Sequence, residues 1–309
     1  MELAEAIRGG DRRALARGLT LVENETSDGV ALLAALGSGG TAHRIGITGP
    51  PGAGKSTLVS ALTASWRSQD ATVGVLAVDP SSPFTGGALL GDRIRMLAHT
   101  GDEDVFIRSL ASRGALGGLS AGVYDAADLL DAAGFDPVLI ETVGVGQGEV
   151  EICRAADTTV VVLAPGSGDV VQGMKAGLLE IADVLVINQA DREGADALEA
   201  ALRSAVELRD GQAPPILTTV ATRGEGVDEL RALLEARAAA GEALIQRRLE
   251  RARARLRAAV DRRRADAFWD ARGEALERVA EDLATGRLSA ADAIVALLDG
   301  SGPAARMDA

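Results

Sequence analysis

The stretch RIGITGPPGAGKSTLVSALTAS, residues 44–65, decides the fold. It begins with a short β-branched run, continues into the pattern G-x-x-x-x-G-K-[ST], and ends in a helical pattern. A strand, a glycine-rich loop and a helix in this order form a phosphate-binding loop, because successive N–H groups and the positive end of the helix face the phosphates. The loop residues are Gly49, Pro50, Pro51, Gly52, Ala53, Gly54, Lys55, Ser56 and Thr57.

The last positions of this loop carry the charge and the metal chemistry. Lys55 is expected to reach the β- and γ-phosphates, and the Ser56 hydroxyl is expected to ligate Mg²⁺. The 32 basic residues of the chain include two lysines, Lys55 and Lys175. Since lysine is a compact charge that fits a narrow cradle and arginine is a wide planar fork, a lysine kept at position 55 supports phosphate binding. The sequence therefore predicts a nucleoside triphosphate site.

Short apolar runs alternate with helical patterns between residue 44 and about residue 220. Strands that are continuous apolar runs, separated by helices, predict an α/β fold with a mostly parallel sheet covered on both faces. The runs are RIGIT (44–48), TVGVLAVD (72–79), DVFIRS (104–109), PVLIE (137–141), TTVVVLA (158–164), DVLVIN (183–188) and PILTTV (215–220).

Helical patterns lie on both sides of this region. We predict an N-terminal helical segment over residues 1–40, the phosphate-loop domain over 41–240 and a C-terminal helical extension over 241–309. The extension could bury little core alone, so we expect it to pack on the α/β domain or on a second copy of the chain. Its basic block, residues 247–264, is interpreted as a solvated helix face, with a helix facing an acidic surface as the alternative.

Composition and charge exclude several classes of function. The net charge of −13 opposes binding to nucleic acid and to anionic membranes. The N-terminus lacks a signal-peptide pattern and no stretch of about eighteen consecutive apolar residues occurs, so a cytoplasmic protein is expected. Cys153 is the single cysteine, which rules out an internal disulfide, and His43 and His99 are the two histidines. The chain thus lacks the cluster that a dedicated zinc or nickel site needs.

Acidic residues end two of the predicted strands. Asp79 ends TVGVLAVD and Glu141 ends PVLIE. In an open α/β sheet the ligand meets the carboxyl ends of the strands, so both carboxylates are expected near a Mg²⁺ ion beside Ser56. Gly144, three residues after Glu141, can bring a bare backbone N–H to the γ-phosphate. Simple strand-end capping is the alternative for each acid.

Four segments together resemble the MeaB/ArgK group of P-loop GTPases. They are GPPGAGKST (49–57), DPSSPFTGGALLGDRIRM (79–96), ETVGVGQGE (141–149) and DVVQGMKAGLLEIAD (169–183). They lie in the family order, and GDRRALARGLTLVEN (10–24) is similar to the family's N-terminal helices, so the resemblance covers about residues 5–300. It implies a parallel-sheet G domain of the SIMIBI type, with a C-terminal helical extension that makes homodimers.

The same resemblance implies a function. Members bind GTP with Mg²⁺, hydrolyse it slowly alone, and act as chaperones of adenosylcobalamin-dependent acyl-CoA mutases, methylmalonyl-CoA mutase above all. They gate delivery of the cofactor by an adenosyltransferase, and they protect or reactivate the mutase. Carried over by motif, the metal set is Ser56, Asp79, Asp92 and Glu141, the catalytic set is Lys55, Asp92, Glu141 and Lys175, and the switch that couples to the mutase is Asp169, Gln172 and Lys175. Glu141 and Gln147 both stay open as the residue that positions the attacking water.

The resemblance also assigns the guanine site. INQAD (187–191) stands where many GTPases have Asn-Lys-x-Asp, and Asn188 is expected to brace the loop and meet the base edge. Asp191 can accept hydrogen bonds from the ring N–H and the exocyclic amine of guanine, whereas adenine offers no such pair of donors. Gln189 replaces the usual lysine, whose aliphatic stem covers the purine face. We therefore predict a lower affinity for the nucleotide with unchanged selectivity for guanine.

A second loop, TTVAT (218–222), completes the predicted guanine site. The resemblance implies that the backbone N–H of Ala221 meets the guanine oxygen, and Val220 stands where a serine is usual.

Three other functions compete with this interpretation. A metal-insertion GTPase that delivers nickel is disfavoured by the scarcity of histidine and cysteine. A P-loop kinase linked to amino-acid transport, as some ArgK names suggest, would show itself by a phosphorylated product. An ATPase is disfavoured because adenine would leave the Asp191 carboxylate unsatisfied, at a cost of about 1–3 kcal/mol.

Overall fold

The computed structural model of the chain describes residues 2–37, 41–79, 99, 101–111, 121–142, 152, 154–166, 177–207 and 213–299. The chain forms two compact units, Met1–Ala252 and Arg253–Ala309.

A seven-stranded parallel sheet forms the centre of the first unit, in the order β3-β2-β4-β1-β5-β6-β7. Each predicted apolar run supplies one strand, so the predicted α/β fold is confirmed. The central strands are buried along their whole length because helices cover both faces of the sheet. The strands are β1 (Arg44–Thr48), β2 (Val73–Asp79), β3 (Val105–Ala111), β4 (Val138–Thr142), β5 (Thr158–Leu163), β6 (Val184–Asn188) and β7 (Ile216–Thr219).

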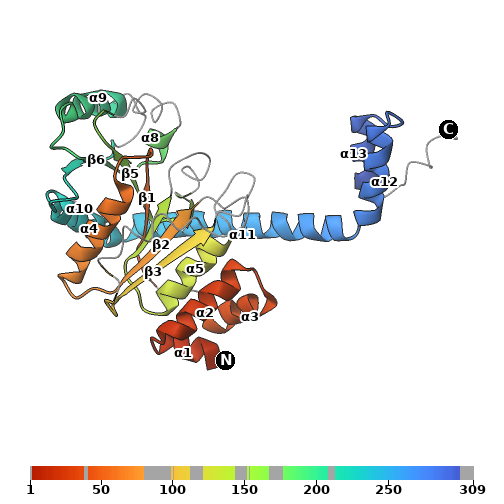
Figure 1. Cartoon of the computed structure of the whole chain (residues 1–309), viewed down its shortest axis with the longest axis horizontal. Coiled ribbons are helices and arrows are strands. Elements are labelled where there is room, and N and C mark those ends of the chain that lie inside the picture. Colours follow the sequence, from red (N-terminus) through yellow and green to blue (C-terminus); the bar gives the residue numbers. More distant parts are fainter. Residues whose placement is uncertain are drawn as a thin grey trace. The chain divides into compact units, whose positions relative to one another are not determined.

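Successive side chains of a strand point to opposite faces, and this alternation divides the core. Val73 and Val75 of β2 belong to the layer under α4 (Lys55–Arg67) and α10 (Val227–Ala238), which pack against each other (Figure 1). Leu76 and Val78 of the same strand belong to the layer under α5 (Ala121–Ala132). Two further helices, α8 (Leu178–Ile181) and α9 (Ala195–Glu207), cover β5 and β6.

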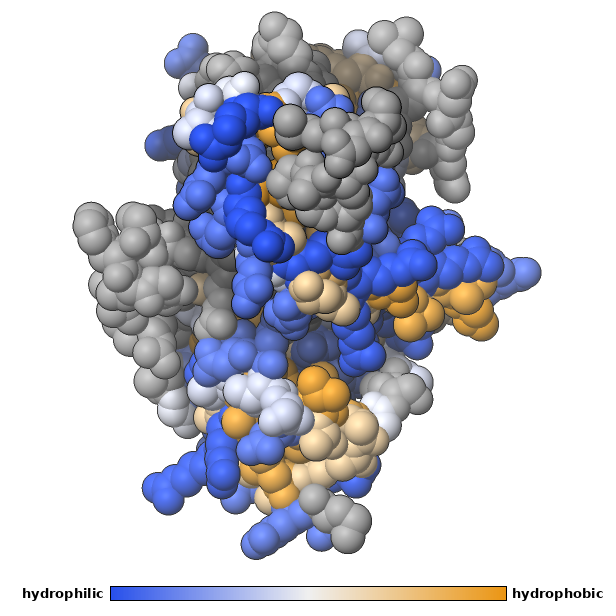
Figure 2. Space-filling view, turned by 90° about the vertical axis from the view of Figure 1, so that its right-hand side faces the viewer, coloured by the Kyte–Doolittle hydropathy of each residue, from blue (hydrophilic) through white to orange (hydrophobic). Residues whose placement is uncertain are grey.

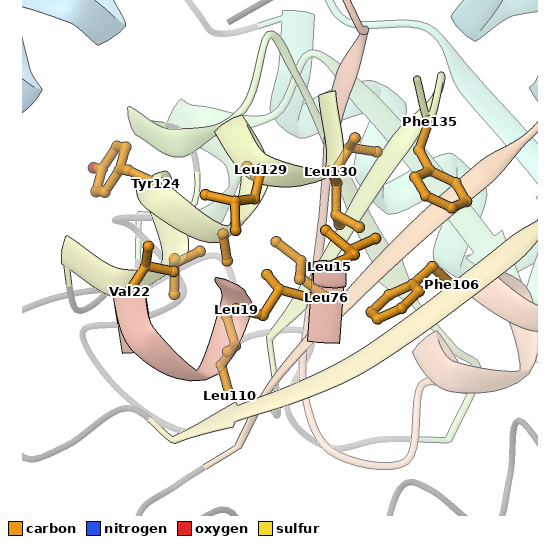
Figure 3. Packing of buried hydrophobic residues seen from close by; sticks show 14 of the residues in the cluster. Leu15, Leu19, Val22, Leu76, Phe106, Leu110, Tyr124, Leu129, Leu130 and Phe135 are labelled. Carbon is orange, nitrogen blue, oxygen red and sulfur yellow. The ribbon is translucent and has the colours of Figure 1, made fainter. Parts of the chain in front are cut away.

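Three N-terminal helices cover α5 and extend its apolar layer: α1 (Glu2–Arg8), α2 (Arg12–Glu23) and α3 (Ser27–Leu36) (Figure 1). Figure 3 shows Leu15 and Leu19 of α2 close to Leu129 of α5 and Leu110 of β3, all of them fully buried. Burying one such leucine contributes about 1.5–3 kcal/mol. The N-terminal helices therefore belong to the core of the first unit.

The long helix α11 (Glu242–Asp270) begins in the first unit, where its arginines bind acidic residues that lie just before two strands of the sheet. Arg251 Nη1 donates to Asp157 Oδ1 at 2.6 Å, and Arg247 Nη2 donates to Asp183 Oδ1 at 2.6 Å. Asp157 and Asp183 directly precede β5 and β6 and lie almost fully out of solvent. The prediction that the basic block is a solvated helix face is therefore wrong for these two arginines, and the alternative of a helix that faces an acidic surface is confirmed for them.

In the second unit, α12 (Gly273–Ala284) and α13 (Ala290–Asp299) pack against each other around Val279 and Ala293. Several large apolar side chains of this unit stay exposed: Leu256, Val260, Trp269, Leu283, Ile294, Val295 and Leu298. Figure 2 shows one face of the molecule, on which hydrophobic residues interrupt a largely hydrophilic surface. Across the described ranges, no helix is both long enough and apolar enough to cross a membrane.

Candidate functional site

The loop between β1 and α4 depends on glycines at two close contacts. Gly49 has φ 140°, and a Cβ atom there would stand 2.0 Å from the Val162 carbonyl oxygen. Gly54, which caps the N-terminus of α4, has φ 85°, and its Cβ atom would stand 2.4 Å from Asn188 Nδ2. Only glycine fits at both positions, so the loop can wind tightly enough to turn its N–H groups inward.

The loop's two functional side chains are buried at its end. Lys55 Nζ donates to the carbonyl oxygens of Gly49 at 2.8 Å and Pro50 at 3.1 Å, which keeps the ammonium inside the loop. Ser56 Oγ donates to Glu141 Oε1 at 2.7 Å, and both residues are buried. The structure thus brings together three residues that the sequence singled out from two separate segments.

Strand pairing explains why Glu141 reaches the phosphate loop. In the register of β1 with β4, Ile47 lies opposite Glu141, one residue before the end of each strand. The neighbouring strand β2 ends at Asp79, and its Ala77 also lies opposite Glu141, so the backbone of Asp79 reaches the same edge of the sheet. The predicted residues Asp92, Gly144, Gln147, Asp169, Gln172 and Lys175 lie outside the described residues.

Asn188 joins three segments at the end of β6. Its Nδ2 donates to the Ala53 carbonyl oxygen in the phosphate loop at 2.9 Å. Its Oδ1 accepts from Thr219 Oγ1 at 3.1 Å and from the Ala221 backbone N–H at 3.2 Å. The N–H that the sequence resemblance assigns to the guanine oxygen is therefore hydrogen-bonded to Asn188 in this structure. A buried amide with partners at both ends fixes the phosphate loop relative to the loop after β7.

Gln189 has hydrogen bonds at both ends of its side-chain amide. Its Nε2 donates to the Gly52 carbonyl oxygen at 3.0 Å, and its Oε1 accepts from Arg192 Nη1 at 2.6 Å. Its backbone is left-handed, with φ 59°. The glutamine thus ties the loop after β6 to the phosphate loop. Arg192 brings a positive charge next to a position where guanine-reading loops usually have lysine.

Asp191 is paired with an arginine from the loop after β7. Arg223 Nη1 donates to Asp191 Oδ2 at 3.0 Å, and the other side of the Arg223 fork binds Glu225. The hydrogen bond from Arg223 is the main cause that lowers the pKa of Glu225, and the hydrogen bond to Glu225 is the main cause that raises the pKa of Arg223. Arg223 and Glu225 are therefore both charged near neutral pH.

A pocket of about 370 Å³ lies beside this charged group, lined by Asp191, Arg223 and Glu225 together with residues of β7 and the start of α10. No residue of the phosphate loop lines it. The pocket is therefore separate from the phosphate loop and adjoins Asp191, the residue predicted to read the base.

A sequence model of one family, described as methylmalonyl Co-A mutase-associated GTPase MeaB, matches residues 15–272. The chain belongs to this family. A Pyrococcus horikoshii protein with GTPase in its name is 55% identical over 236 residues, which cover 74% of this chain and 74% of that protein. The mouse protein named methylmalonic aciduria type A homolog, mitochondrial, is 39% identical over 194 residues, which cover 60% of this chain and 47% of that protein.

Among solved structures, that of a protein named LAO/AO transport system kinase aligns with a TM-score of 0.70 and 28% identity, covering 97% of this chain and 96% of that one. The match to MeaB confirms the family resemblance found in the sequence motifs. Because the matching family and the Pyrococcus relative are both named as GTPases, this chain is a GTPase and binds GTP and GDP.

Sequence reasoning missed three residues that contact the candidate site in this MeaB-family chain: Arg192, Arg223 and Glu225. A weak signal existed, since each lies within a few positions of a predicted base loop. Exposed charges are common on any surface, however, so position alone could not separate these three from their neighbours. Within the described part of the chain, no three or more His, Cys, Asp and Glu side chains gather into a group that could hold a metal ion.

Proposed function

We propose that this GTPase is a Mg²⁺-dependent chaperone that gates adenosylcobalamin loading of an acyl-CoA mutase of the methylmalonyl-CoA mutase type and protects or reactivates that mutase. The observation that carries the proposal is the match of residues 15–272 to a family described as associated with methylmalonyl Co-A mutase. The mouse relative, whose name refers to methylmalonic aciduria, agrees with it.

The proposed nucleotide site follows the contacts around the phosphate loop. Lys55 leaves the carbonyl oxygens of Gly49 and Pro50, 2.8 and 3.1 Å away, and neutralises the β- and γ-phosphates. Asn188 keeps the phosphate loop and the Ala221 loop at a fixed separation through its buried amide. Asp191 accepts from the two guanine donors, which gives the preference for GTP over ATP.

Mg²⁺ fits the place where Ser56 meets Glu141. A hard cation prefers oxygen ligands, and here a hydroxyl and a carboxylate oxygen lie 2.7 Å apart beside the phosphate loop. Ser56 is the proposed direct ligand, while Asp79, Asp92 and Glu141 complete its surroundings. When bound, the ion neutralises charge on the phosphate oxygens, and the chain's own residues position the nucleotide for in-line attack by water.

The proposed coupling to the mutase involves Asp169, Gln172 and Lys175, and the proposed partners also include an adenosyltransferase and a second copy of this chain. A segment that γ-phosphate contacts hold in order is released on hydrolysis, which is how a GTPase signals to a partner. We propose a cytoplasmic location for this assembly.

The test measures free phosphate release from GTP by the full chain, with and without a methylmalonyl-CoA mutase from the same organism. We expect the mutase to accelerate hydrolysis and Lys175→Ala to remove the acceleration while GDP affinity stays near the wild-type value. Lys55→Ala is the matched control at the other lysine and is expected to lose nucleotide binding itself. If no adenosylcobalamin-dependent mutase changes the rate, the chaperone proposal is wrong.

The same assay tests the alternative of a P-loop kinase, which the alignment with the transport system kinase structure favours. A kinase transfers the γ-phosphate to an acceptor, so a phosphorylated product would accumulate in place of free phosphate. With the GTPase proposed here, the released phosphate equals the GTP consumed.

A further inference from the structure

The carboxylate proposed to read guanine is held by a neighbouring arginine. Arg223 Nη1 donates to Asp191 Oδ2 at 3.0 Å. A carboxylate offers about four lone-pair positions on its two oxygens, so this contact leaves Oδ1 and one lone pair of Oδ2 for the two donors of guanine. Arg223 can therefore stay in place while Asp191 binds the base.

Among the described residues, the contact with Arg223 is what holds the Asp191 carboxylate in one orientation. Its side chain is 39% exposed, so its carboxylate would rotate in water without a partner. Val220, the first residue of the adjoining loop, is buried and apolar and has no side-chain donor to offer. Arg223 supplies the donor three residues later.

The arginine is itself fixed by a carboxylate on the same loop. Arg223 Nε donates to Glu225 Oε1 at 2.7 Å and Nη2 donates to Glu225 Oε2 at 3.2 Å. This two-pronged pairing sets the plane of the guanidinium and leaves Nη1 directed at Asp191. Lysine has no planar fork and could not hold both carboxylates in this geometry.

The backbone fixes Glu225 in turn. The N–H of Val220 donates to the Glu225 carbonyl oxygen at 3.0 Å, and the N–H of Arg223 donates to the Val220 carbonyl oxygen at 2.8 Å. Gly226 follows with φ 73°, and a Cβ atom there would stand 2.1 Å from the Thr218 carbonyl oxygen. The loop from 220 to 226 is thus a turn closed by backbone hydrogen bonds, and this turn carries the arginine.

We propose that Arg223, held by Glu225, is a positioning residue that orients the Asp191 carboxylate for guanine and so sets base selectivity. This inference rests on the proposed role of Asp191. It assigns to Arg223 a role in specificity, with no contact to the reacting phosphates.

The test compares the dissociation constants of GDP, IDP and ADP for the full chain. Inosine lacks the exocyclic amine, so the ratio of IDP to GDP dissociation constants reports the second hydrogen bond to Asp191. We expect Arg223→Ala to raise the dissociation constant of GDP about 3- to 10-fold and that of IDP by a smaller factor, which lowers this ratio. Arg223→Lys and Glu225→Gln, which preserve most of the side-chain volume, are expected to lower the ratio by smaller factors.

The matched control is Arg203→Ala. Arg203 forms an exposed pair with Glu199 on α9, at a Nη2–Oε1 distance of 2.6 Å, so it resembles the Arg223–Glu225 pair without adjoining Asp191. We expect it to leave all three dissociation constants unchanged. If Arg223→Ala raises the dissociation constants of GDP, IDP and ADP by one common factor, the arginine has a structural role alone and the inference is wrong. Tighter GDP binding would also overturn it, because Arg223 would then compete with guanine.

The variant Asp191→Ala distinguishes a failure of the Arg223 inference from a failure of the proposed guanine-reading role of Asp191. If the wild-type chain prefers GDP to ADP and Asp191→Ala loses the preference, the role of Asp191 stands, and an unchanged ratio in all three loop variants overturns the role of Arg223 alone. If Asp191→Ala keeps the preference for GDP, both assignments are wrong.

Discussion

At the scale of single residues, Gln189 holds two parts of the nucleotide site together with a neutral side chain. Its amide bridges the Gly52 carbonyl oxygen and Arg192, so both ends are hydrogen-bonded. A lysine at this position would keep the donor to Gly52 but would place an ammonium beside the Arg192 guanidinium. The gain from covering the purine face would then be offset in part by repulsion between two cations.

The first prediction follows from this balance. Gln189→Lys is expected to tighten GDP and GTP together, by about 3- to 10-fold, because an aliphatic stem and a charge over a purine contribute about 1 kcal/mol. Competition binding with labelled GDP measures the change, and the GTP-over-ATP preference should stay constant. The double variant Gln189→Lys with Arg192→Ala is the control, and it should bind more tightly still. A change in which base is bound would contradict the division of roles between Gln189 and Asp191.

The second prediction concerns the two glycines that flank Ala53. Gly54→Ala is expected to lower the free energy of unfolding by about 2–4 kcal/mol, because a strained backbone adds to a clash with buried Asn188. Gly52 is the matched control, since it has φ 79° with nothing within 4 Å of an added Cβ, so Gly52→Ala should cost about 1–2 kcal/mol. Urea unfolding of both variants decides, and equal losses would mean that the contact with Asn188 carries no energy.

At the scale of elements, buried charges hold the beginning of α11 to the sheet. The Asp157 side chain is fully buried, and it accepts from the Arg44 backbone N–H at 3.1 Å and from Arg251 Nη1 at 2.6 Å. Arg248 Nε lies 3.7 Å from its second oxygen. Removing one partner of a buried ion pair leaves the other charge without compensation. The resulting loss in the free energy of unfolding is larger than the stability that the intact pair contributes.

Asp157→Asn is therefore the third prediction. It keeps the shape and removes the charge, and we expect a loss of about 3–5 kcal/mol in the free energy of unfolding. Asp282→Asn, at the exposed pair with Arg287, is the control and should cost less than about 1 kcal/mol. Urea unfolding of the two variants provides the comparison. Similar small losses would show that the α11 arginines contribute nothing to stability.

The elements also show what the sequence could and could not predict. The apolar runs predicted every strand of the sheet, because burial on both faces leaves a continuous hydrophobic pattern. The strand-end rule also predicted Glu141 beside Ser56, although 85 residues separate the two. The strand order was less accessible, since nothing local in the sequence encodes which strands pair. The solvated-face prediction for the α11 arginines was wrong because their acidic partners lie 64 and 94 positions away, where no local pattern can reveal them.

At the scale of the whole molecule, His43 links folding to pH. Burial is the main cause that lowers its pKa below the ordinary 6.5, against the opposing charges of Asp157 and Asp136 and with smaller effects of Arg248 and Arg237. The unfolded chain thus binds a proton more readily than the folded chain. His43 Nε2 lies 2.9 Å from Thr158 Oγ1, so the ring also has a buried partner.

The fourth prediction is a loss of stability as the pH falls below about 6.5. A lowered folded pKa gives stability that is fully present above the unfolded pKa and is lost as the pH falls toward the folded pKa. His43→Gln keeps a polar group near Thr158 and removes the titration, so its unfolding free energy should depend less on pH between about 5 and 7. Thermal unfolding across this range compares the wild type with the variant. If the unfolding free energies of wild type and His43→Gln depend on pH in the same way, His43 is not the source of the pH dependence.

The exposed apolar side chains of the second unit lead to the last prediction. Ile294 and Leu298 are each about 60% exposed and lie one turn apart on α13, so they form one face of that helix. Surface of this kind is stabilised when another chain covers it, and a second copy of this chain is the occupant that the family resemblance implies.

We expect the full chain to sediment as a dimer and Ile294→Glu with Leu298→Glu to sediment as a monomer, because four buried charges per dimer would have no partners. Val30→Glu is the matched control: Val30 is also an exposed apolar residue, but it lies in the first unit, so this variant should stay dimeric. Analytical ultracentrifugation at micromolar concentration measures the state of each. A dimer that survives the double substitution would place the contact elsewhere on the chain, and a monomeric wild type would exclude the dimer.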